Sequence, residues 1–412
     1  MGSTVLRDAV WGDIGLGPRE IALIDTGAFQ RLRRVKQLGT TDLVFPGARH
    51  TRFEHSIGVF HLAGLALGRL AAIGVGADAA DERALLAAAL LHDVGHYPFS
   101  HAVEELEVDQ VRRHTDIARD LITGELAATL EEEWDVDPHL VASLVAGPQQ
   151  GDAPLTATQS LLRSLLDSSL DVDKLDYLVR DARGANVPYG VVDVERLLGS
   201  LAVRDPGDGP RELAVETKGV SALQSLVFAK HLMFATVYWH HACRSAVVML
   251  LRALQEALRA GYVKAPELER SDDDELLATL RAPDAPDLVR TLASRLRDRR
   301  LYKRAVEVGV DSPDFERLER LWFRPAQRSV LEDGWAASVG AAEGDVLLDV
   351  PEPRRIVVDL PVIVGDGEAS EWDLVSGLAT TDLDRFQRWV RKIRIFATDA
   401  DVAAAFGSSG VL

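Results

Sequence analysis

The feature that most constrains this chain is the stretch Leu85–Glu105, LLAAALLHDVGHYPFSHAVEE. Its run of Leu and Ala predicts a buried helix, because both residues are strong helix formers. The helix delivers His92 and Asp93 at its end, and Gly95 and Pro98 loosen or terminate it soon afterwards. An ordinary helix terminus with one satisfied core histidine would explain any single histidine here. The density of polar groups beside so apolar a run instead indicates metal-ligand side chains in a dry, shaped site.

Composition sets the broad class. The chain has 412 residues, 47% hydrophobic and 27% charged, which is ordinary for a globular protein of two or three domains. No uninterrupted apolar run reaches the ~18 residues that cross a bilayer, so we expect no membrane partner. The N-terminus shows no secretory signal. Cys243 is the only cysteine, which excludes an intrachain disulfide and favours a reducing cytoplasm. The usage of Ala, Arg and Asp is typical of a bacterial protein.

Charge limits the partners. The formal net charge of −18 gives no attraction to the phosphates of duplex DNA, so we expect no binding of bulk nucleic acid. A small phosphorylated ligand remains compatible, because a metal ion and a few basic side chains reverse the local field. The histidines are clustered, since seven of the 11 fall between His50 and His114. That window is where we look for a site.

Hydrophobic periodicity predicts a mostly helical chain. An N-terminal hairpin or extended arm precedes the first helix. Helices are expected at 50–70, at an Ala-rich segment ending at His92, and at 114–134, 171–181, 216–260 and 382–393. Strands are expected in a hairpin around the turn 205–210, within 345–365, and at 394–397. The charged stretch 267–320 is expected to form exposed helices.

Three of the predicted helices carry candidate metal ligands. Two imidazoles and two carboxylates suit one divalent ion such as Mn²⁺, Fe²⁺, Zn²⁺, Co²⁺ or Ni²⁺, and Mg²⁺ less well. Such an ion polarises a phosphoryl group, activates water, or does both. Arg52 and Lys174 stand nearby in the sequence, where a planar fork and a point charge would bind phosphate oxygens. The candidate ligands are His55, His92, Asp93 and Asp173.

A second polar group follows directly after the first. His96, His101 and His114 are candidates for proton transfer, because an unperturbed imidazole has a pKa near ~6.5. Glu104 lies three residues after His101 and can orient a histidine by fixing its tautomer. The four residues are therefore candidate catalytic groups.

Four longer blocks carry a family resemblance. They are IDTGAFQRLRRVKQLG (Ile24–Gly39), FPGARHTRFEHSIGV (Phe45–Val59), HDVGHYPFSH (His92–His101) and DVDKLDYLVRD (Asp171–Asp181). In this order the chain resembles the HD-domain metal-dependent phosphohydrolases, and in particular the branch that hydrolyses deoxynucleoside triphosphates to deoxynucleoside and tripolyphosphate. The resemblance implies a mostly α fold, with an HD-domain helical core at 1–265 and a smaller α+β C-terminal lobe at 266–412. It also implies a homo-oligomer.

The resemblance implies a role for each matching residue. The four candidate ligands would bind one divalent metal ion. His101 would approach the α-phosphorus or the leaving oxygen, with His96, His114 and Glu104 beside it. The implied substrate contacts are Arg52, Lys174 and Lys230 for the triphosphate, Tyr177 and Asp181 for the sugar, and Gln37 and Tyr238 for the nucleoside.

Departures from the family pattern concern substrate choice. Lys230 stands where Arg is frequent, Phe234 where His is expected, and Trp239 where a polar residue is expected. All three lie on the helical stretch that would face the base and the phosphates.

A nucleotide activator is a further partner that the resemblance implies, because some relatives bind nucleotides between subunits. Asp25, Gln30 and Arg33 match positions that read guanine in those relatives. Thr4, however, occupies the place of an expected phosphate-binding lysine.

Three functions are therefore open at this point. The first is a metal-dependent deoxynucleoside triphosphate triphosphohydrolase. The second is another HD phosphohydrolase that removes phosphates from a different nucleotide or a modified nucleoside phosphate, which the departures at Phe234 and Trp239 favour. The third is a non-catalytic nucleotide sensor, against which the intact set of ligands, His101 and Glu104 argues.

Overall fold

The computed structural model of the chain describes residues 4–205, 211–353, 360–364, 368–377 and 380–410. The chain begins with an antiparallel hairpin of β1 (Thr4–Asp8) and β2 (Gly12–Leu16), as the sequence predicted. Short helical segments follow. They are α1 (Pro18–Ile24), α2 (Gly27–Arg31), η1 (Leu32–Arg34) and η2 (Gly39–Leu43).

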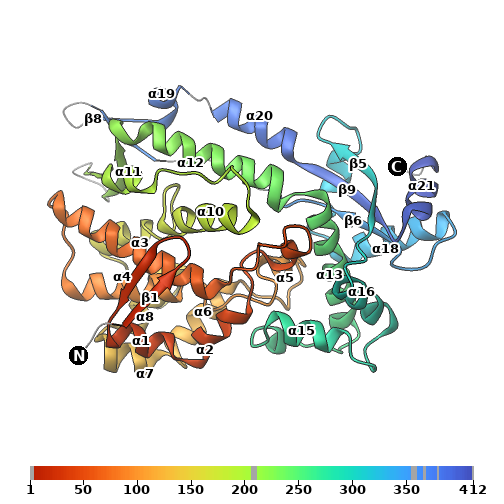
Figure 1. Cartoon of the computed structure of the whole chain (residues 1–412), viewed down its shortest axis with the longest axis horizontal. Helices are drawn as coiled ribbons and strands as arrows, with labels where there is room; N and C mark the ends of the chain where they lie inside the picture. The colour runs from red at the N-terminus through yellow and green to blue at the C-terminus, as the bar shows by residue number, and fades with distance from the viewer. Residues whose placement is uncertain (1–3, 206–210, 354–359, 365–367, 378–379, 411–412) are drawn as a thin grey trace.

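Two long helices organise the helical part (Figure 1). Helix α3 (Arg52–Ala72) begins where the Glu54 side chain accepts the Thr51 backbone N–H at 3.0 Å. Helix α10 (Val172–Ala185) packs against it and ends at Asn186 in the left-handed conformation. Around them lie α4 (Ala79–Leu91), α5 (His101–Glu104), α6 (His114–Thr123), α7 (Ala127–Thr129), η3 (Leu130–Trp134), α8 (Pro138–Ala146), α9 (Ala157–Ser164) and α11 (Val194–Gly199).

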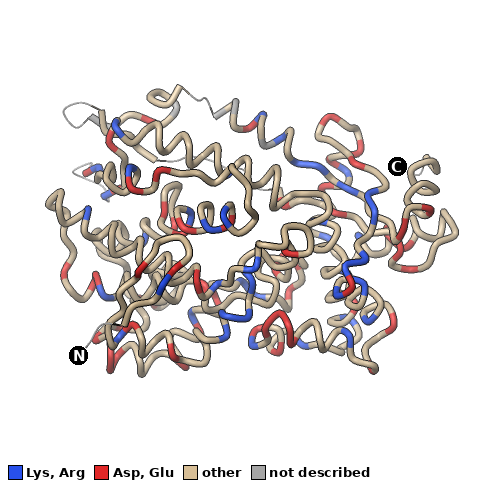
Figure 2. Tube along the Cα trace, viewed as in Figure 1, with Lys and Arg blue, Asp and Glu red and all other residues tan. Residues whose placement is uncertain are grey.

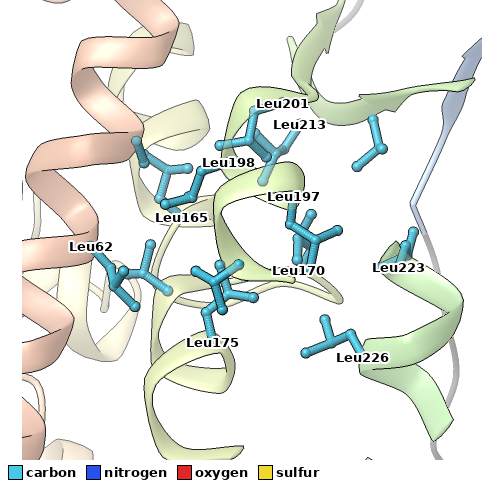
Figure 3. Close-up of a cluster of buried hydrophobic side chains, with 14 of the residues drawn as sticks. Leu62, Leu165, Leu170, Leu175, Leu197, Leu198, Leu201, Leu213, Leu223 and Leu226 are labelled. Atoms are coloured by element: carbon cyan, nitrogen blue, oxygen red, sulfur yellow. The ribbon is translucent and has the colours of Figure 1, made fainter. Parts of the chain in front are cut away.

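A cluster of buried leucines fixes α3, α10 and α11 against α12 (Val220–Met233). Leu62 of α3, Leu175 of α10 and Leu226 of α12 point into it together with Leu197 of α11 (Figure 3). Burial of a leucine side chain contributes about 1.5–3 kcal/mol, so this cluster determines how the helices meet. The packing sets the start of α3 beside the start of α10, which is where the candidate ligands lie.

The predicted C-terminal α+β lobe is present, and the fold is mostly α as expected. One sheet, in the order β5-β9-β6, belongs to this lobe, while the second sheet, in the order β3-β4-β7-β8, joins two strands from before residue 266 to two from the lobe. The segment η5 (Phe234–Tyr238) leads into α13. The helices are α13 (His241–Arg259), α14 (Ala265–Leu268), α15 (Asp273–Leu280), α16 (Asp287–Arg297), α17 (Phe315–Glu319), α18 (Pro325–Ser338), α19 (Trp372–Ser376), α20 (Thr380–Val390) and α21 (Ala400–Ser408). The strands are β3 (Leu201–Arg204), β4 (Glu212–Glu216), β5 (Lys303–Gly309), β6 (Val346–Asp349), β7 (Val362–Val364), β8 (Glu368–Ser370) and β9 (Lys392–Ala397).

Two boundaries differ from the sequence prediction. The charged stretch 267–320 contains strand β5, because its residues pair antiparallel with β9. The predicted helix at 382–393 ends at Val390, and Lys392 and Ile393 already belong to β9. The sequence KIRIFA alternates polar and apolar residues up to the pair Ile395 and Phe396, a strand pattern that tertiary pairing with β5 and β6 selects over helix. The strands predicted within 345–365 are confirmed as β6 and β7, and residues 354–359 and 365 of that segment lie outside the described residues.

One described segment, Thr217–Tyr238, is long and apolar enough to cross a membrane, with a mean hydropathy of 1.3. The sequence prediction of no such segment missed it because it counted only uninterrupted apolar runs. Half of its most apolar window is buried inside the protein, and core helices of soluble proteins meet the same criterion. Its helix α12 contains Lys230 as its one charged residue, whereas charges of both signs lie along α10 (Figure 2).

Candidate active site

Each candidate ligand stands at the end of a helix. His55 is in the first turn of α3, and Asp173 is in the first turn of α10. Helix α4 ends at Leu91, so that His92 is its C-cap and Asp93 follows directly. Three helix ends thus bring together two imidazoles and two carboxylates from a stretch of 119 residues.

The donor atoms of these four side chains converge. His55 Nε2 lies 2.9 Å from Asp173 Oδ1, 3.2 Å from His92 Nε2 and 3.5 Å from Asp93 Oδ2. His92 Nε2 lies 3.5 Å from Asp93 Oδ1 and 3.7 Å from Asp173 Oδ1. Ligands bound at about 2.0–2.2 Å to one ion stand roughly 3 Å or more apart, so these separations fit a single divalent ion.

Hydrogen bonds behind the two imidazoles orient them. His55 Nδ1 contacts Asp176 Oδ2 at 2.7 Å, and His92 Nδ1 contacts the carbonyl oxygen of Ala89 at 2.9 Å. An acceptor at Nδ1 places one proton there, so that Nε2 is the nitrogen that faces the centre and would bind a metal ion in exchange for any second proton. This second contact of each ring is the arrangement usual for histidine metal ligands.

Asp176 was not among the residues predicted from the sequence. Arg180 holds its carboxylate with Nε at 2.8 Å and Nη2 at 2.8 Å, and also donates to Asp8 Oδ2 at 2.8 Å. The Trp11 indole N–H donates to Asp176 as well. A sequence signal existed: Asp176 follows Asp173 by three residues and precedes Arg180 by four, so that all three share one side of a helix.

The electrostatics of the centre favour a cation. Burial opposes charge on His55, but its hydrogen bonds to Asp173 and Asp176 outweigh burial and raise its pKa to about 10. Burial would raise the pKa of Asp93, yet Arg52 and His92 hold it well below its usual range. Burial likewise opposes the ionised form of Asp173, and its bonds to His55 and His92 lower its pKa. Both carboxylates are therefore ionised, and two negative charges at one place, buried Asp93 and half-buried Asp173, attract positive charge.

The four candidate catalytic residues lie together next to this centre. His96 Nε2 is 3.1 Å from Asp93 Oδ1, and its ring stacks on that of His114 with centroids 3.8 Å apart. Glu104 joins the other two, with Oε2 2.9 Å from His101 Nδ1 and Oε1 2.8 Å from His114 Nδ1. His101 is exposed, whereas His96 is buried, and burial followed by Arg52 and His114 lowers its pKa well below the usual value. His96 is therefore neutral, and the His101 ring is open to solvent.

Arg52 differs in part from the sequence prediction of a phosphate contact. It is buried, and its guanidinium donates to Asp93 and, through Nε at 2.9 Å, to Ser100 Oγ. In this structure it links a metal-ligand carboxylate to the loop before α5. Ser100 in turn donates to the carbonyl oxygen of Lys36 at 2.7 Å. Neither Ser100 nor this link carries a signal in the sequence.

Asp181 and Tyr238, both predicted sugar or nucleoside contacts, meet at the far end of α10. The Tyr238 hydroxyl donates to Asp181 Oδ2 at 2.7 Å, and His50 Nε2 lies 2.7 Å from Asp181 Oδ1. Burial and then the negative charge of Asp181 raise the pKa of Tyr238 well above its ordinary value, so its hydroxyl keeps its proton. His50 is a partner that no sequence signal distinguishes from the nearby His61.

The other predicted substrate residues are more dispersed. The Lys174 ammonium contacts Asp171 and the carbonyl oxygen of Ser168 at 2.8 Å, and these bonds do not bring it to the four ligands. Gln37 is partly buried, and its Oε1 lacks a partner among the described residues. Tyr177 packs at the edge of the leucine cluster, and Lys230 lies in the last turn of α12.

The predicted activator residues lie on α1, α2 and η1, away from the ligands in sequence. Asp25 is exposed at the C-terminal end of α1. Gln30 and Arg33 contact one another at 2.9 Å, and the Arg33 guanidinium lies 3.5 Å from the centroid of the Phe53 ring.

The helical fold and the His-His-Asp-Asp centre define a class of protein, the HD-domain proteins. Residues 52–180 match the family model of the HD domain, and residues 192–408 match that of the HD associated region. The chain belongs to the family in which the associated region follows the HD domain. Its side chains can hold a divalent metal, as HD domains do.

Relatives of this chain occur in distant organisms. An uncharacterized protein of Methanocaldococcus jannaschii is 30% identical over 91% of this chain and 75% of its own length. The SAMHD1 homologue of Dictyostelium discoideum, named a deoxynucleoside triphosphate triphosphohydrolase, is 29% identical over 84% of this chain and 67% of its own. The crystal structure of a hypothetical protein from Aquifex aeolicus superposes with a TM-score of 0.76 at 24% identity, covering 99% of this chain and 100% of the other. That likeness concerns the fold.

Proposed function

We propose that this protein hydrolyses deoxynucleoside triphosphates to deoxynucleoside and tripolyphosphate in a metal-dependent reaction. The observation that carries the proposal is the convergence of His55, His92 and Asp93, with Asp173 against both histidines, beside a group of three histidines and a glutamate. The triphosphohydrolase name of the Dictyostelium relative supports the substrate class.

The four ligands would hold a divalent ion, with Mn²⁺, Fe²⁺, Zn²⁺, Co²⁺ or Ni²⁺ suited to the mixed donor set and Mg²⁺ less so. When bound, such an ion would supply Lewis-acid polarisation of a phosphoryl oxygen. The protein supplies the rest. Glu104 accepts from His101 Nδ1, so the protonated His101 would present Nε2–H to the leaving oxygen as a general acid. The neutral, buried His96 would hold Asp93 and His114 in position, through its Nε2 contact with Asp93 and its ring stacking on His114.

The nucleoside end would be read by groups on α10 and η5. Asp181 keeps acceptor capacity beyond its bonds to His50 and Tyr238, and would accept from a sugar 3′-hydroxyl. Tyr177 would crowd a 2′-hydroxyl, and Gln37 would contact the base. The triphosphate would be bound by Arg52, Lys174 and Lys230. For Lys174, the triphosphate would have to displace the carboxylate of Asp171, which the ammonium group contacts in this structure.

A second candidate function is phosphate removal from another nucleotide or a modified nucleoside phosphate. One observation favours it: Phe234 packs edge-on against Tyr238 and Trp239, with ring centroids 5.0 and 5.1 Å apart. This aromatic cluster stands where the related triphosphohydrolases carry polar groups, so it would reshape the base end of the site.

Further proposals follow from the family. We propose a cytoplasmic homo-oligomer that takes a nucleotide substrate, with an activator nucleotide at Asp25, Gln30 and Arg33. We also retain a division of the chain into an HD core at 1–265 and a C-terminal lobe at 266–412. The non-catalytic sensor remains an outcome of the test below.

The test is product analysis. Metal-replete protein is incubated separately with each of the four deoxynucleoside and four ribonucleoside triphosphates, and products are resolved by anion exchange. We expect deoxynucleoside and tripolyphosphate in equal amounts from the deoxy substrates. Stepwise release of orthophosphate would instead support the second candidate. Binding of nucleotide without turnover, for every added metal, would support the sensor and contradict the proposal.

A further inference from the structure

Helix α5 carries two of the candidate catalytic residues, His101 and Glu104, but cannot hold its own position. It is only four residues long, and helices shorter than about 12 residues are marginal without tertiary support. The two residues before it, Phe99 and Ser100, have φ angles of 57° and 59°, in a region that side-chain-bearing residues rarely adopt. Contacts from elsewhere must therefore impose this geometry.

Asp273, at the start of α15, secures the N-terminal end of α5. Its Oδ1 accepts the backbone N–H of Phe99 at 2.7 Å, and its Oδ2 accepts the backbone N–H of Lys36 at 3.1 Å. The Asp273 side chain is buried, so both bonds form away from water. The Asp273 carboxylate thus joins the strained turn before α5 to the backbone of Lys36. The same turn is bound to Lys36 a second time, because the Ser100 hydroxyl donates to the Lys36 carbonyl oxygen.

Arg244, on α13, secures the C-terminal end. Glu105 caps α5, and its two carboxylate oxygens accept from Arg244 Nη1 at 2.9 Å and Nη2 at 2.7 Å. Arg244 also donates to Asp349 of β6, from Nε at 3.0 Å and Nη2 at 2.8 Å. Arg244 and Asp349 are buried, so their ion pair fixes the orientation of the guanidinium that binds both oxygens of Glu105.

Asp273, Arg244 and Asp349, which we call the α5 clamp, all lie within the matched HD-associated region. Their described contacts include Phe99 and Glu105, which flank α5, and none of the described contacts goes to the four candidate metal ligands. We infer that the HD-associated region positions α5 for catalysis by gripping both of its ends through the α5 clamp. These are positioning residues, since each acts through α5, and their kinetic role rests on the proposed function.

The experiment compares Asp273→Asn with Asp274→Asn, an exposed neighbour on the same helix, and Glu105→Gln with Asp109→Asn, an exposed acid beyond α5. Asn and Gln keep the side-chain volume. They remove the negative charge through which Asp273 binds two backbone N–H groups and Glu105 binds Arg244. Four quantities are measured for each: bound metal per chain, melting temperature, kcat and KM for a turned-over deoxynucleoside triphosphate, and deuterium exchange in peptides covering 99–106.

In Asp273→Asn and Glu105→Gln we expect kcat to fall about tenfold or more, because small misplacements of catalytic groups are costly. KM should stay within about threefold and the metal content should be unchanged, as for a group that acts only on the reacting geometry. Exchange in 99–106 should be about tenfold faster in these two variants. Both control variants should match the wild type.

The inference would be overturned if both test variants had the same kcat and the same deuterium exchange as the wild type. It would also be overturned if, in both test variants, the loss of kcat were no larger than the loss of bound metal or of folded protein. The residues would then only stabilise the fold or the metal centre. Should the wild type hydrolyse no nucleotide, the proposed function fails separately. Deuterium exchange then decides the α5 clamp alone, with faster exchange supporting it and unchanged exchange refuting it.

Discussion

Asp176 contacts the Nδ1 side of the His55 ring, which points away from the candidate metal centre. That contact sets the orientation of the imidazole. The substitution Asp176→Asn removes the charge that Arg180 and His55 share and frees the ring to turn. We predict a ten- to hundredfold loss of metal affinity, as is usual for partners of ligating histidines. Competition with a chromogenic chelator measures it, with Asp167→Asn at an exposed acid as the control. Equal affinity in the variant and wild type would contradict the prediction.

The residue types of the candidate site could be predicted from the sequence, but not all of the residues that contact them. His55, His92, Asp93 and Asp173 could be proposed because a metal needs those donors and the spacing puts them at helix ends. His50, Ser100 and Arg31 could not, because each acts through a tertiary contact. Arg31 is buried and donates to the carbonyl oxygens of Val94 and His96, at 3.0 and 2.7 Å, an arrangement that requires the fold to be known.

At the scale of elements, the contact between α3 and α10 depends on a glycine. A Cβ on Gly58 would stand 1.9 Å from Asp176 Oδ1 and 2.5 Å from Arg180 Nη2, both held by buried ion pairs. We predict that Gly58→Ala lowers the free energy of unfolding by about 2–3 kcal/mol or more. Gly68→Ala, on the same helix with open space around it, should instead raise it by about 0.5–1 kcal/mol. Urea denaturation measures both, and equal effects would contradict the prediction.

The start of α15 makes stability depend on pH. Burial raises the pKa of Asp273 to about 6, against the opposing effect of the Phe99 and Lys36 backbone N–H bonds, with Lys36 and Asp272 as its charged neighbours. The folded protein therefore binds this proton more tightly than the unfolded chain. The resulting stabilisation, about 3 kcal/mol, is complete below the unfolded pKa near ~4 and is lost as pH rises through 6.

Denaturation of the wild type and of Asp273→Asn at several pH values between 4 and 7 checks this sign. The wild type should lose stability relative to the variant as the pH rises, because only the wild type gives up that proton. Parallel pH dependences would show that Asp273 does not titrate in this range.

The sequence predicted most elements because their signals are local. The hairpin, the helix that begins near Arg52 and the Ala-rich helix that ends before His92 each follow from periodicity, capping residues and turn residues. It misplaced the end of α20 and missed β5, since the residues of β5 and β9 adopt strands only by pairing with each other across about 90 residues of chain.

At the scale of the whole molecule, the helical core and the C-terminal lobe share apolar contacts. One buried cluster joins residues on both sides of position 265, so the division at 265 stays a prediction about function rather than independent folding. Among its members are Tyr97, Phe99, Leu250, Leu292, Leu347 and Phe396. We predict that a fragment of residues 1–265 aggregates or fails to unfold cooperatively, because it exposes this cluster. Circular dichroism and size-exclusion chromatography test it, and a monomeric, cooperatively unfolding fragment would contradict it.

The most direct test of the account counts metal ions. Wild-type protein and Asp173→Asn are stripped with a chelator, reconstituted with Mn²⁺, desalted and assayed by mass spectrometry of the metal. Asp173 is the most exposed of the four ligands, so its replacement perturbs the buried core least. We expect about one ion per wild-type chain and far less in the variant, because four ligands on one ion bind more tightly than three. Equal metal in both proteins, or none in the wild type with any divalent transition ion, would contradict it.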